Sequence, residues 1–328
     1  MILQRKSDPI DFTYVLATGG VSLILKTAGW NILSAVFLIL ACSCFISLIV
    51  LFGVRGFLYK KMDNLFEYLT FGASTNILAL CFAARGYDFV GAVLGILGTI
   101  TIVFLIYAIF CVCFFYQKSA IELISPQWMI MGIACHTVSM LIMTLWQHAM
   151  LSHPGFLLFA FCFWSFGILL YLFLMTLNLY RMFFLPFEGR DVRPSYWMCL
   201  GAAAIAAVDG SRLVLIDQLP LFLAALKPFI EGMVFLFWGW GTAWIPLLIL
   251  ILIFQYTYYK MPIRYQSEQW AIVFALSMHT VVMEIFASQF NLEILRNIIP
   301  IWMWTSIFCW CVIALMIGLD FRRSLRRM

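Results

Sequence analysis

Ten apolar stretches, separated by charged or turn-forming segments, most constrain what this chain can fold into. Most of them reach the roughly 17 to 25 residues that an α-helix needs to cross a bilayer. Because 65% of the residues are hydrophobic and only 11% are charged, the composition excludes a soluble domain. We therefore predict an all-α integral membrane protein, a single transmembrane domain over 1–328 with spans at 11–28, 30–58, 65–84, 89–117, 127–150, 155–184, 195–216, 221–259, 268–290 and 292–320.

The basic residues indicate how the chain is oriented in the membrane. If the first span starts in the cytoplasm, fifteen of the 20 Lys and Arg residues fall on the cytoplasmic side and five on the other. Lys and Arg are enriched in cytoplasmic loops. Both termini are therefore predicted to be cytoplasmic, in an inner or plasma membrane, which agrees with an even number of spans. The net charge of +5 reflects this orientation and does not indicate a nucleic-acid partner.

Catalytic motifs are missing from the sequence. It has no phosphate-binding loop, no zinc-binding histidine pair of the hydrolase type and no serine nucleophile elbow. The ten cysteines lie in apolar spans, where they are expected to serve as small apolar fillers. We predict that the protein is not an enzyme and that it holds no metal and no cofactor.

The odd-numbered spans repeat one pattern, in which an aromatic residue is followed four places later by a small one. Internal repetition of this kind is expected when one helical hairpin has been copied around an axis. We predict five hairpins, with the odd spans around a central pore and the even spans outside. The pairs are Tyr68 and Gly72, Trp128 and Gly132, Trp197 and Gly201, more loosely Tyr14 and Thr18 with Gly19 beside it, and finally Trp270 and Phe274, where the small residue is replaced.

Phe274 is thus predicted to block a passage that the small residues leave open. Two alternatives stand beside this hypothesis. Small residues also serve simply to bring membrane helices close together. Phe274 could equally be an ordinary core or lipid-facing phenylalanine, one of the 32 in the chain.

Short motifs in the odd spans resemble those of a known transporter family. They are VLATGGVS from Val15, PQWMIMG from Pro126, PSYWMCLG from Pro194, and the spacing of Trp270, Phe274 and Ser277. In this order they resemble the tellurite-resistance and C4-dicarboxylate transporter family, which includes plant slow anion channels and fungal malate and sulfite carriers. The resemblance covers nearly the whole chain.

That resemblance implies five inner helices around a pore, five outer helices and a homotrimer with one pore per subunit. It also implies that a phenylalanine of the ninth helix closes the pore, and this residue corresponds to Phe274. Two positions depart from the family pattern: Ala275 stands where plant-type members tend to carry proline, and Ala17 replaces a glycine of the first motif. Both substitutions affect how the helices bend.

The function predicted on this basis is an anion-selective channel of the slow-anion-channel type for small inorganic or organic anions. A pore lined by small side chains replaces the hydration of an anion only in part, so selectivity must come from dipoles and distant positive charge. One alternative is a secondary carrier or exporter for C4-dicarboxylates, sulfite or tellurite-related oxyanions. A remote alternative is a redox protein with a haem held by His136 and His279.

Two sets of site residues follow. Intramembrane charges are costly and often functional, so three of them are assigned to an outer vestibule: Arg212, Lys227 and Glu284. The alternative is that such charges are compensated by neighbours on the same helix and extend toward the membrane surface. Glu284 would repel an anion unless it is paired, turned away or used to carry a proton. The histidines fit buried hydrogen bonding or pH sensing. Besides the gate Phe274, the predicted pore-lining residues are Gly19, Gly72, Gly132, Gly201, Ser277, His136 and His279.

Overall fold

The fold comes from a computed structural model that describes residues 9–55, 65–116, 124–185, 193–216 and 219–325. Within these ranges the chain forms ten α-helices and no strand, which confirms the predicted all-α class. The helices are α1 (Thr13–Thr27), α2 (Asn31–Arg55), α3 (Leu65–Ala83), α4 (Asp88–Cys111), α5 (Ile130–Gln147), α6 (Gly155–Phe184), α7 (Trp197–Val214), α8 (Leu221–Thr257), α9 (Trp270–Gln289) and α10 (Glu293–Leu325).

Nine of these helical segments are long and apolar enough to cross a membrane. The exception is α1, whose 15 residues extend only about 22 Å at 1.5 Å per residue. A 3₁₀ turn at Pro9–Phe12 precedes it and completes most of the predicted first span. The fourth predicted span continues beyond α4 as a π-helical turn at Val112–Tyr116.

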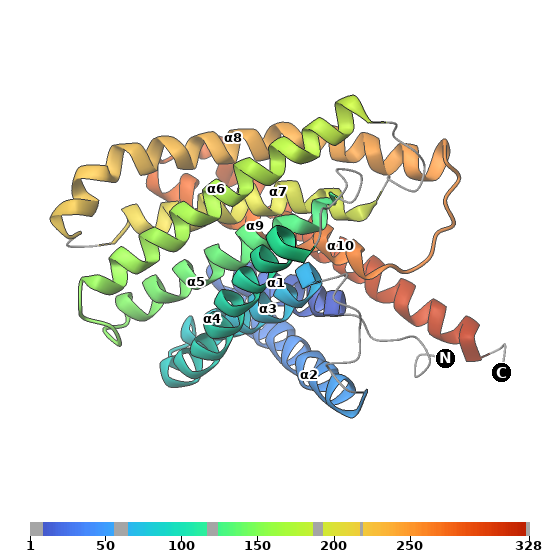
Figure 1. The fold of residues 1–328 in the computed structure, drawn as a ribbon, viewed down its shortest axis with the longest axis horizontal. Helices are drawn as coiled ribbons and strands as arrows, with labels where there is room; N and C mark the ends of the chain where they lie inside the picture. Colours follow the sequence, from blue (N-terminus) through green and yellow to red (C-terminus); the bar gives the residue numbers. More distant parts are fainter. Residues whose placement is uncertain (1–8, 56–64, 117–123, 186–192, 217–218, 326–328) are drawn as a thin grey trace.

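The five odd-numbered helices form a closed ring. Each contacts the next, in the order α1, α3, α5, α7 and α9, and α9 returns to α1. Each even-numbered helix packs against the odd helix that precedes it, so that the chain forms five helical hairpins (Figure 1). Burial agrees with this arrangement, since 94% of the α7 span is buried but only 17% of the α10 span. The predicted division into inner odd and outer even helices is therefore confirmed.

The odd helices begin in a repeated way. A 3₁₀ turn leads into α1, α5, α7 and α9, and the last three turns span Pro126–Met129, Pro194–Tyr196 and Ser267–Gln269. Neighbouring turns contact one another from one helix to the next around the ring. Proline in two of these turns suits a helix start, because the first backbone N–H groups of a helix have no intrahelical partner. These four odd helices therefore start at the same end of the molecule and run parallel.

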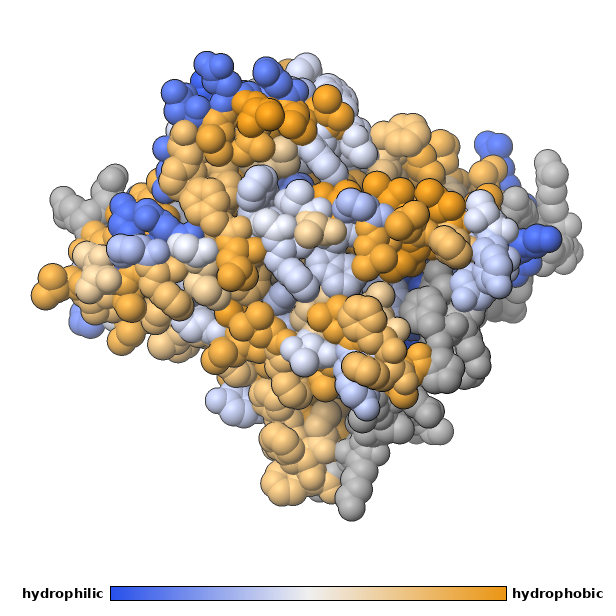
Figure 2. Space-filling view, turned by 90° about the horizontal axis from the view of Figure 1, so that it is seen from above, coloured by the Kyte–Doolittle hydropathy of each residue, from blue (hydrophilic) through white to orange (hydrophobic). Residues whose placement is uncertain are grey.

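The outer helices present apolar side chains to the surroundings. On α4 the exposed residues recur along one face, and apolar side chains occupy large areas of the face in Figure 2, with the most hydrophilic groups near its edges. Contiguous apolar surface of this extent is rare on proteins that face water, whereas it is what hydrocarbon requires. The exposed α4 set is Val93, Ile96, Leu97, Ile100, Phe104 and Tyr107.

Candidate functional site

Phe274 lies on α9, where this helix meets α7, its neighbour in the ring of odd helices. Its side chain is only 1% exposed, which excludes the lipid-facing alternative. A Cβ atom built on Gly201 of α7 would lie 3.1 Å from Cδ1 of Phe274 and 3.4 Å from Cα of Ala275. Because Gly201 has no side chain, the benzyl ring of Phe274 packs directly against α7. Of the predicted glycines, Gly201 is the one that adjoins Phe274.

Gly72 and Gly132 face outer helices. A Cβ atom on Gly72 would lie 2.7 Å from Cγ1 of Ile102 on α4, and one on Gly132 would lie 3.1 Å from the carbonyl oxygen of Gly167 on α6. These glycines allow an inner and an outer helix to approach closely, the use that the sequence left open as an alternative. Their lining of a pore stays a prediction.

Hairpins α3–α4 and α5–α6 also share a buried polar side chain that packs against a glycine of the outer helix. Four residues after Gly72 comes Asn76, and four residues after Gly132 comes His136. Each of these polar side chains fits against a glycine of the outer helix: a Cβ atom on Gly98 would lie 2.2 Å from Oδ1 of Asn76, and one on Gly167 would lie 2.8 Å from Nε2 of His136. The outer-helix glycines thus make room for buried polar side chains.

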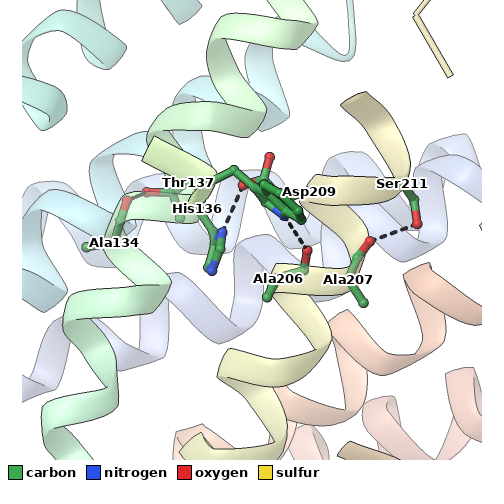
Figure 3. Close-up of polar contacts among 8 residues, drawn as sticks. Ala134, His136, Thr137, Ala206, Ala207, Asp209 and Ser211 are labelled. Carbon is green, nitrogen blue, oxygen red and sulfur yellow. Dashed lines mark hydrogen bonds and ion pairs between the residues drawn. The ribbon is translucent and has the colours of Figure 1, made fainter. Parts of the chain in front are cut away.

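Both polar side chains also reach the next inner helix. The Asn76 amide donates a hydrogen bond to Oγ1 of Thr137 on α5, at 3.3 Å. Nδ1 of His136 lies 2.9 Å from Oδ2 of Asp209 on α7 (Figure 3). Two hydrogen bonds in equivalent places therefore connect three successive helices of the ring, α3, α5 and α7.

The His136–Asp209 pair is completely buried, because both side chains are 0% exposed. His136 Nε2 has no hydrogen-bond partner among the described residues, whereas the carboxyl group of Asp209 also interacts with the hydroxyl of Ser139. Arg212 follows Asp209 by three residues, and its Nη1 donates to Oγ1 of Thr144 on α5 at 3.1 Å. Asp209 and Arg212 therefore each bond to α5. A titratable pair with free hydrogen-bonding capacity lies between two helices of the ring.

The family profile described as voltage-dependent anion channel, SLAC1, matches residues 8–317. This range includes every helix of the ring and nearly all of the outer layer. The chain belongs to this family. It is a multi-pass membrane protein of the SLAC1 group of channels and transporters, as the family resemblance predicted.

Three relatives are similar to parts of this chain. An uncharacterized membrane protein of Mycobacterium tuberculosis is 27% identical over 143 residues, which cover 44% of this chain and 72% of the relative. An uncharacterized transporter of Methanocaldococcus jannaschii is 23% identical over 249 residues, 75% of this chain and 70% of the relative. A second transporter of that archaeon is 26% identical over 149 residues, 45% of this chain and 42% of the relative.

Two more predicted pore residues of this SLAC1-family chain contact neighbouring helices. A Cβ atom on Gly19 would lie 2.4 Å from Cγ2 of Ile77 on α3. Oγ of Ser277 lies 2.9 Å from Oγ of Ser306 on α10. Gly19 thus brings α1 close to α3, and Ser277 connects α9 to its own outer helix. The pore-lining role of both residues stays a prediction.

The second histidine, His279, lies on α9 in surroundings unlike those of His136. Its ring packs edge-on against Trp302 of α10, with the ring centres 5.3 Å apart. The side chain is buried, and its Nδ1 has no hydrogen-bond partner among the described residues. His136 and His279 therefore occupy separate places, one against α7 and one against α10.

The predicted vestibule residues are dispersed over three helices. Arg212 lies on α7, near the end of the ring away from the 3₁₀ turns. Glu284 on α9 accepts a hydrogen bond from the hydroxyl of Thr27, at the end of α1. Lys227 is half-buried on α8, an outer helix, and makes no hydrogen bond or ion pair with a described residue. Arg212 and Glu284 thus share the ring, whereas Lys227 lies outside it.

Arg85 is a further charged residue that the sequence did not single out. From the end of α3, its guanidinium donates to the carbonyl oxygen of Cys81 at 2.6 Å, to Oγ of Ser22 on α1 at 2.8 Å, and to the carbonyl and hydroxyl oxygens of Ser34 on α2. All these acceptors are uncharged. The positive charge of Arg85 is therefore not neutralised by any of its hydrogen-bond partners.

A second histidine–aspartate pair lies at the surface. Nδ1 of His148, just after α5, is 2.6 Å from Oδ1 of Asp88 at the start of α4. The two side chains are 34% and 23% exposed, unlike those of the buried pair. Among the described residues, a histidine–aspartate pair therefore occurs both in the buried interior and at the surface.

Proposed function

We propose that this protein conducts small anions along the axis of the ring formed by α1, α3, α5, α7 and α9, and that Phe274 closes the passage. The proposal is carried by the contact between the buried Phe274 side chain and Gly201. A large apolar side chain of α9 there faces a position at which α7 carries no side chain. The family match supports anions as the transported class. An apolar ring in a narrow passage excludes water and therefore hydrated ions.

Selectivity for anions is proposed to come from positive charge at the end of the ring opposite the 3₁₀ turns. Arg85 donates only to uncharged acceptors, and Arg212 donates to the Thr144 hydroxyl. The contacts of Arg85 leave its charge uncancelled, whereas the charge of Arg212 is offset in part by the carboxyl group of Asp209. A cation at some distance attracts an anion without binding it tightly, and weak binding permits rapid passage.

Replacement of Phe274 by Ala tests the gate. In voltage-clamped membranes or planar bilayers, we expect the Phe274→Ala variant to show an ohmic anion conductance at least about tenfold above that of the wild type, because the removal of a steric barrier of about 1.4 kcal/mol has that effect. Reversal potentials in chloride, nitrate, malate and sulfite then rank the permeant anions.

Phe286→Ala is the matched control. Phe286 lies on the same helix and is equally buried, but its ring packs against Phe235 and Trp238 of the outer helix α8. The same loss of a benzyl group there should leave the conductance unchanged. The gate is disproved if Phe274→Ala folds and conducts no more than the control.

A secondary carrier is the second candidate, and Glu284 is the observation that favours it. Its carboxyl group bonds to the Thr27 hydroxyl and to no cation among the described residues. Such a group can carry a proton together with an anion. A carrier with Phe274→Ala would lose coupled transport without reaching channel-like flux, so the same recordings separate the two mechanisms.

The assembly and orientation are also proposals. We propose a homotrimer with one passage per subunit, one transmembrane domain over 1–328, and both termini in the cytoplasm. The five cations assigned to the outer side against fifteen on the cytoplasmic side support this orientation. Mass measurement in nanodiscs tests the trimer, and protease access to terminal tags in sealed cells tests the orientation.

A further inference from the structure

The buried His136–Asp209 pair has an unpartnered imidazole nitrogen, which has no part in the proposed gate. The 2.9 Å contact joins His136 Nδ1 to one carboxylate oxygen, and the other ring nitrogen, Nε2, remains without a partner. A neutral imidazole that donates from Nδ1 carries a lone pair on Nε2, and this lone pair accepts a proton. We propose that His136 and Asp209 form a proton-binding site, and that uptake of one proton by this site increases anion flux through the ring. This inference rests on the proposed function.

The proton balance is simple. A proton from water bonds to the Nε2 lone pair of His136, while the Nδ1 hydrogen continues to bond to Oδ2 of Asp209. The product is an imidazolium beside a carboxylate. Since both side chains are 0% exposed, an isolated charge on either would be costly. The pair lowers that cost, because each charge is the counter-ion of the other.

The charged groups near His136 favour the uptake of one proton by the pair and not of two. On α7, Arg212 lies three residues beyond Asp209 and interacts with its carboxyl group. Neutral imidazole, carboxylate and guanidinium sum to zero, and protonation of His136 adds one positive charge. Cys135 is the titratable neighbour on α5 itself. The contacts nearest to His136 from the other packed helices are uncharged: Gly167 of α6 against the His136 ring, Asn76 of α3 against Thr137, and Gly95 of α4 against Leu141. Asp88 of α4 pairs with His148, twelve residues beyond His136.

The site is close enough to the passage for its charge to matter. On α7, Asp209 follows Gly201 by eight residues, which is about 12 Å along a helix axis. Gly201 is the residue that contacts Phe274. A unit charge about 12 Å from an anion, at an effective dielectric constant of about 20, changes the local concentration of the anion about tenfold. We therefore expect flux to increase about tenfold on protonation.

The test measures nitrate or chloride flux in proteoliposomes with equal pH on both sides, between about pH 5 and pH 8, the range in which imidazole changes charge. The wild-type flux should rise about tenfold as the pH falls. His136→Gln should abolish the rise, because an amide does not take up the proton. Asp209→Asn should move the rise to lower pH or abolish it, because the imidazolium loses its counter-ion.

His148→Gln and Asp88→Asn are matched controls. They change the surface pair in the same way, and the 34% and 23% exposure of its side chains means that solvent already screens its charge. The pH response should therefore persist in both. A response that persists in His136→Gln, or that disappears in His148→Gln, overturns the proposal.

Other outcomes separate this inference from the proposed function. If wild type and Phe274→Ala carry no anion, the proposed function fails. If they conduct but the wild-type flux does not change with pH, the proton site fails alone. If His136→Gln does not fold, imidazole ¹⁵N NMR of the wild type decides, with His148→Gln, His153→Gln and His279→Gln for assignment. A His136 ring that stays neutral over the whole range overturns the proposal, and one that titrates supports it.

Discussion

The benzyl ring of Phe274 packs beside Gly201, so that a methyl group added at Gly201 would lie 3.1 Å from Cδ1 of Phe274. This distance is shorter than ordinary carbon contacts of about 3.5 to 4.0 Å. The ring would have to move away from α7. The position of the proposed gate therefore depends on a glycine of the neighbouring helix.

Gly201→Ala should lower the residual anion flux of the wild type about two- to fivefold, which corresponds to about 0.4 to 1 kcal/mol, because the methyl group pushes the Phe274 ring across the passage. In a Phe274→Ala background the methyl group has room, and the flux should not change. A double-mutant cycle of anion conductance measures this coupling. Equal effects of Gly201→Ala in both backgrounds would mean that the two residues act independently.

Gly98→Ala should destabilise the protein. The new Cβ atom would lie 2.2 Å from Oδ1 of Asn76, which is itself buried. Overpacking of this kind reduces the free energy of unfolding by about 1 to 3 kcal/mol. The midpoint of thermal unfolding in detergent is the measurement. Gly239→Ala on α8 is the control, because a Cβ atom there has no neighbour within 4 Å, and a helical alanine gains up to about 1 kcal/mol over glycine.

Arg85→Gln should reduce both stability and anion flux. The guanidinium connects α3 to Ser22 of α1 and Ser34 of α2, and its loss removes hydrogen bonds from a charged donor, each of about 1.5 to 3 kcal/mol. Ser22 and Ser34 remain bonded to each other. Arg296→Gln removes the same charge from an exposed side chain that donates to Asn291. Unfolding midpoints and flux should change in the first variant and scarcely in the second. Equal losses of flux would instead assign the effect to overall charge.

Glu284→Gln distinguishes a channel from a carrier. Glu284 lies ten residues beyond Phe274 on α9, about 15 Å along the helix. In a channel, the loss of a carboxylate charge at that range should raise anion conductance about fivefold. In a proton-coupled carrier, uptake driven by a pH gradient should disappear. Glu231→Gln on the outer helix α8 should have neither effect, and an effect of equal size there would rule out a specific role of Glu284.

Much of the fold could be predicted from the sequence, because a membrane helix satisfies its backbone hydrogen bonds within itself. The length and hydrophobicity of each stretch then suffice to place it, and ten predicted spans correspond to ten helices. The repeated openings of the odd spans also predicted the inner ring. The sequence did not distinguish the 3₁₀ turns that open α1, α5, α7 and α9 from the α-helices that follow them.

The candidate site was predicted in part. Phe274 was singled out as the large residue in a series of small ones, and the structure buries it where α9 meets α7. Its role as a gate stays a prediction. The partner of His136 was not predicted, because Asp209 is 73 positions away and a sequence alone does not place two such residues together. The only signal was the presence of titratable residues within inner spans. Arg85 was missed for the same reason, since its partners lie on α1 and α2.

The sequence by itself determined the helices, their order and their sorting into inner and outer layers, since these follow from apolar length and repetition along the chain. Only the tertiary structure decided which way each residue faces. Gly72 and Gly132 turn toward outer helices whereas Gly201 turns toward Phe274, although all three follow an aromatic residue by four places. The rotation of a helix about its own axis is set by packing against its neighbours, and that packing is not encoded in any single segment.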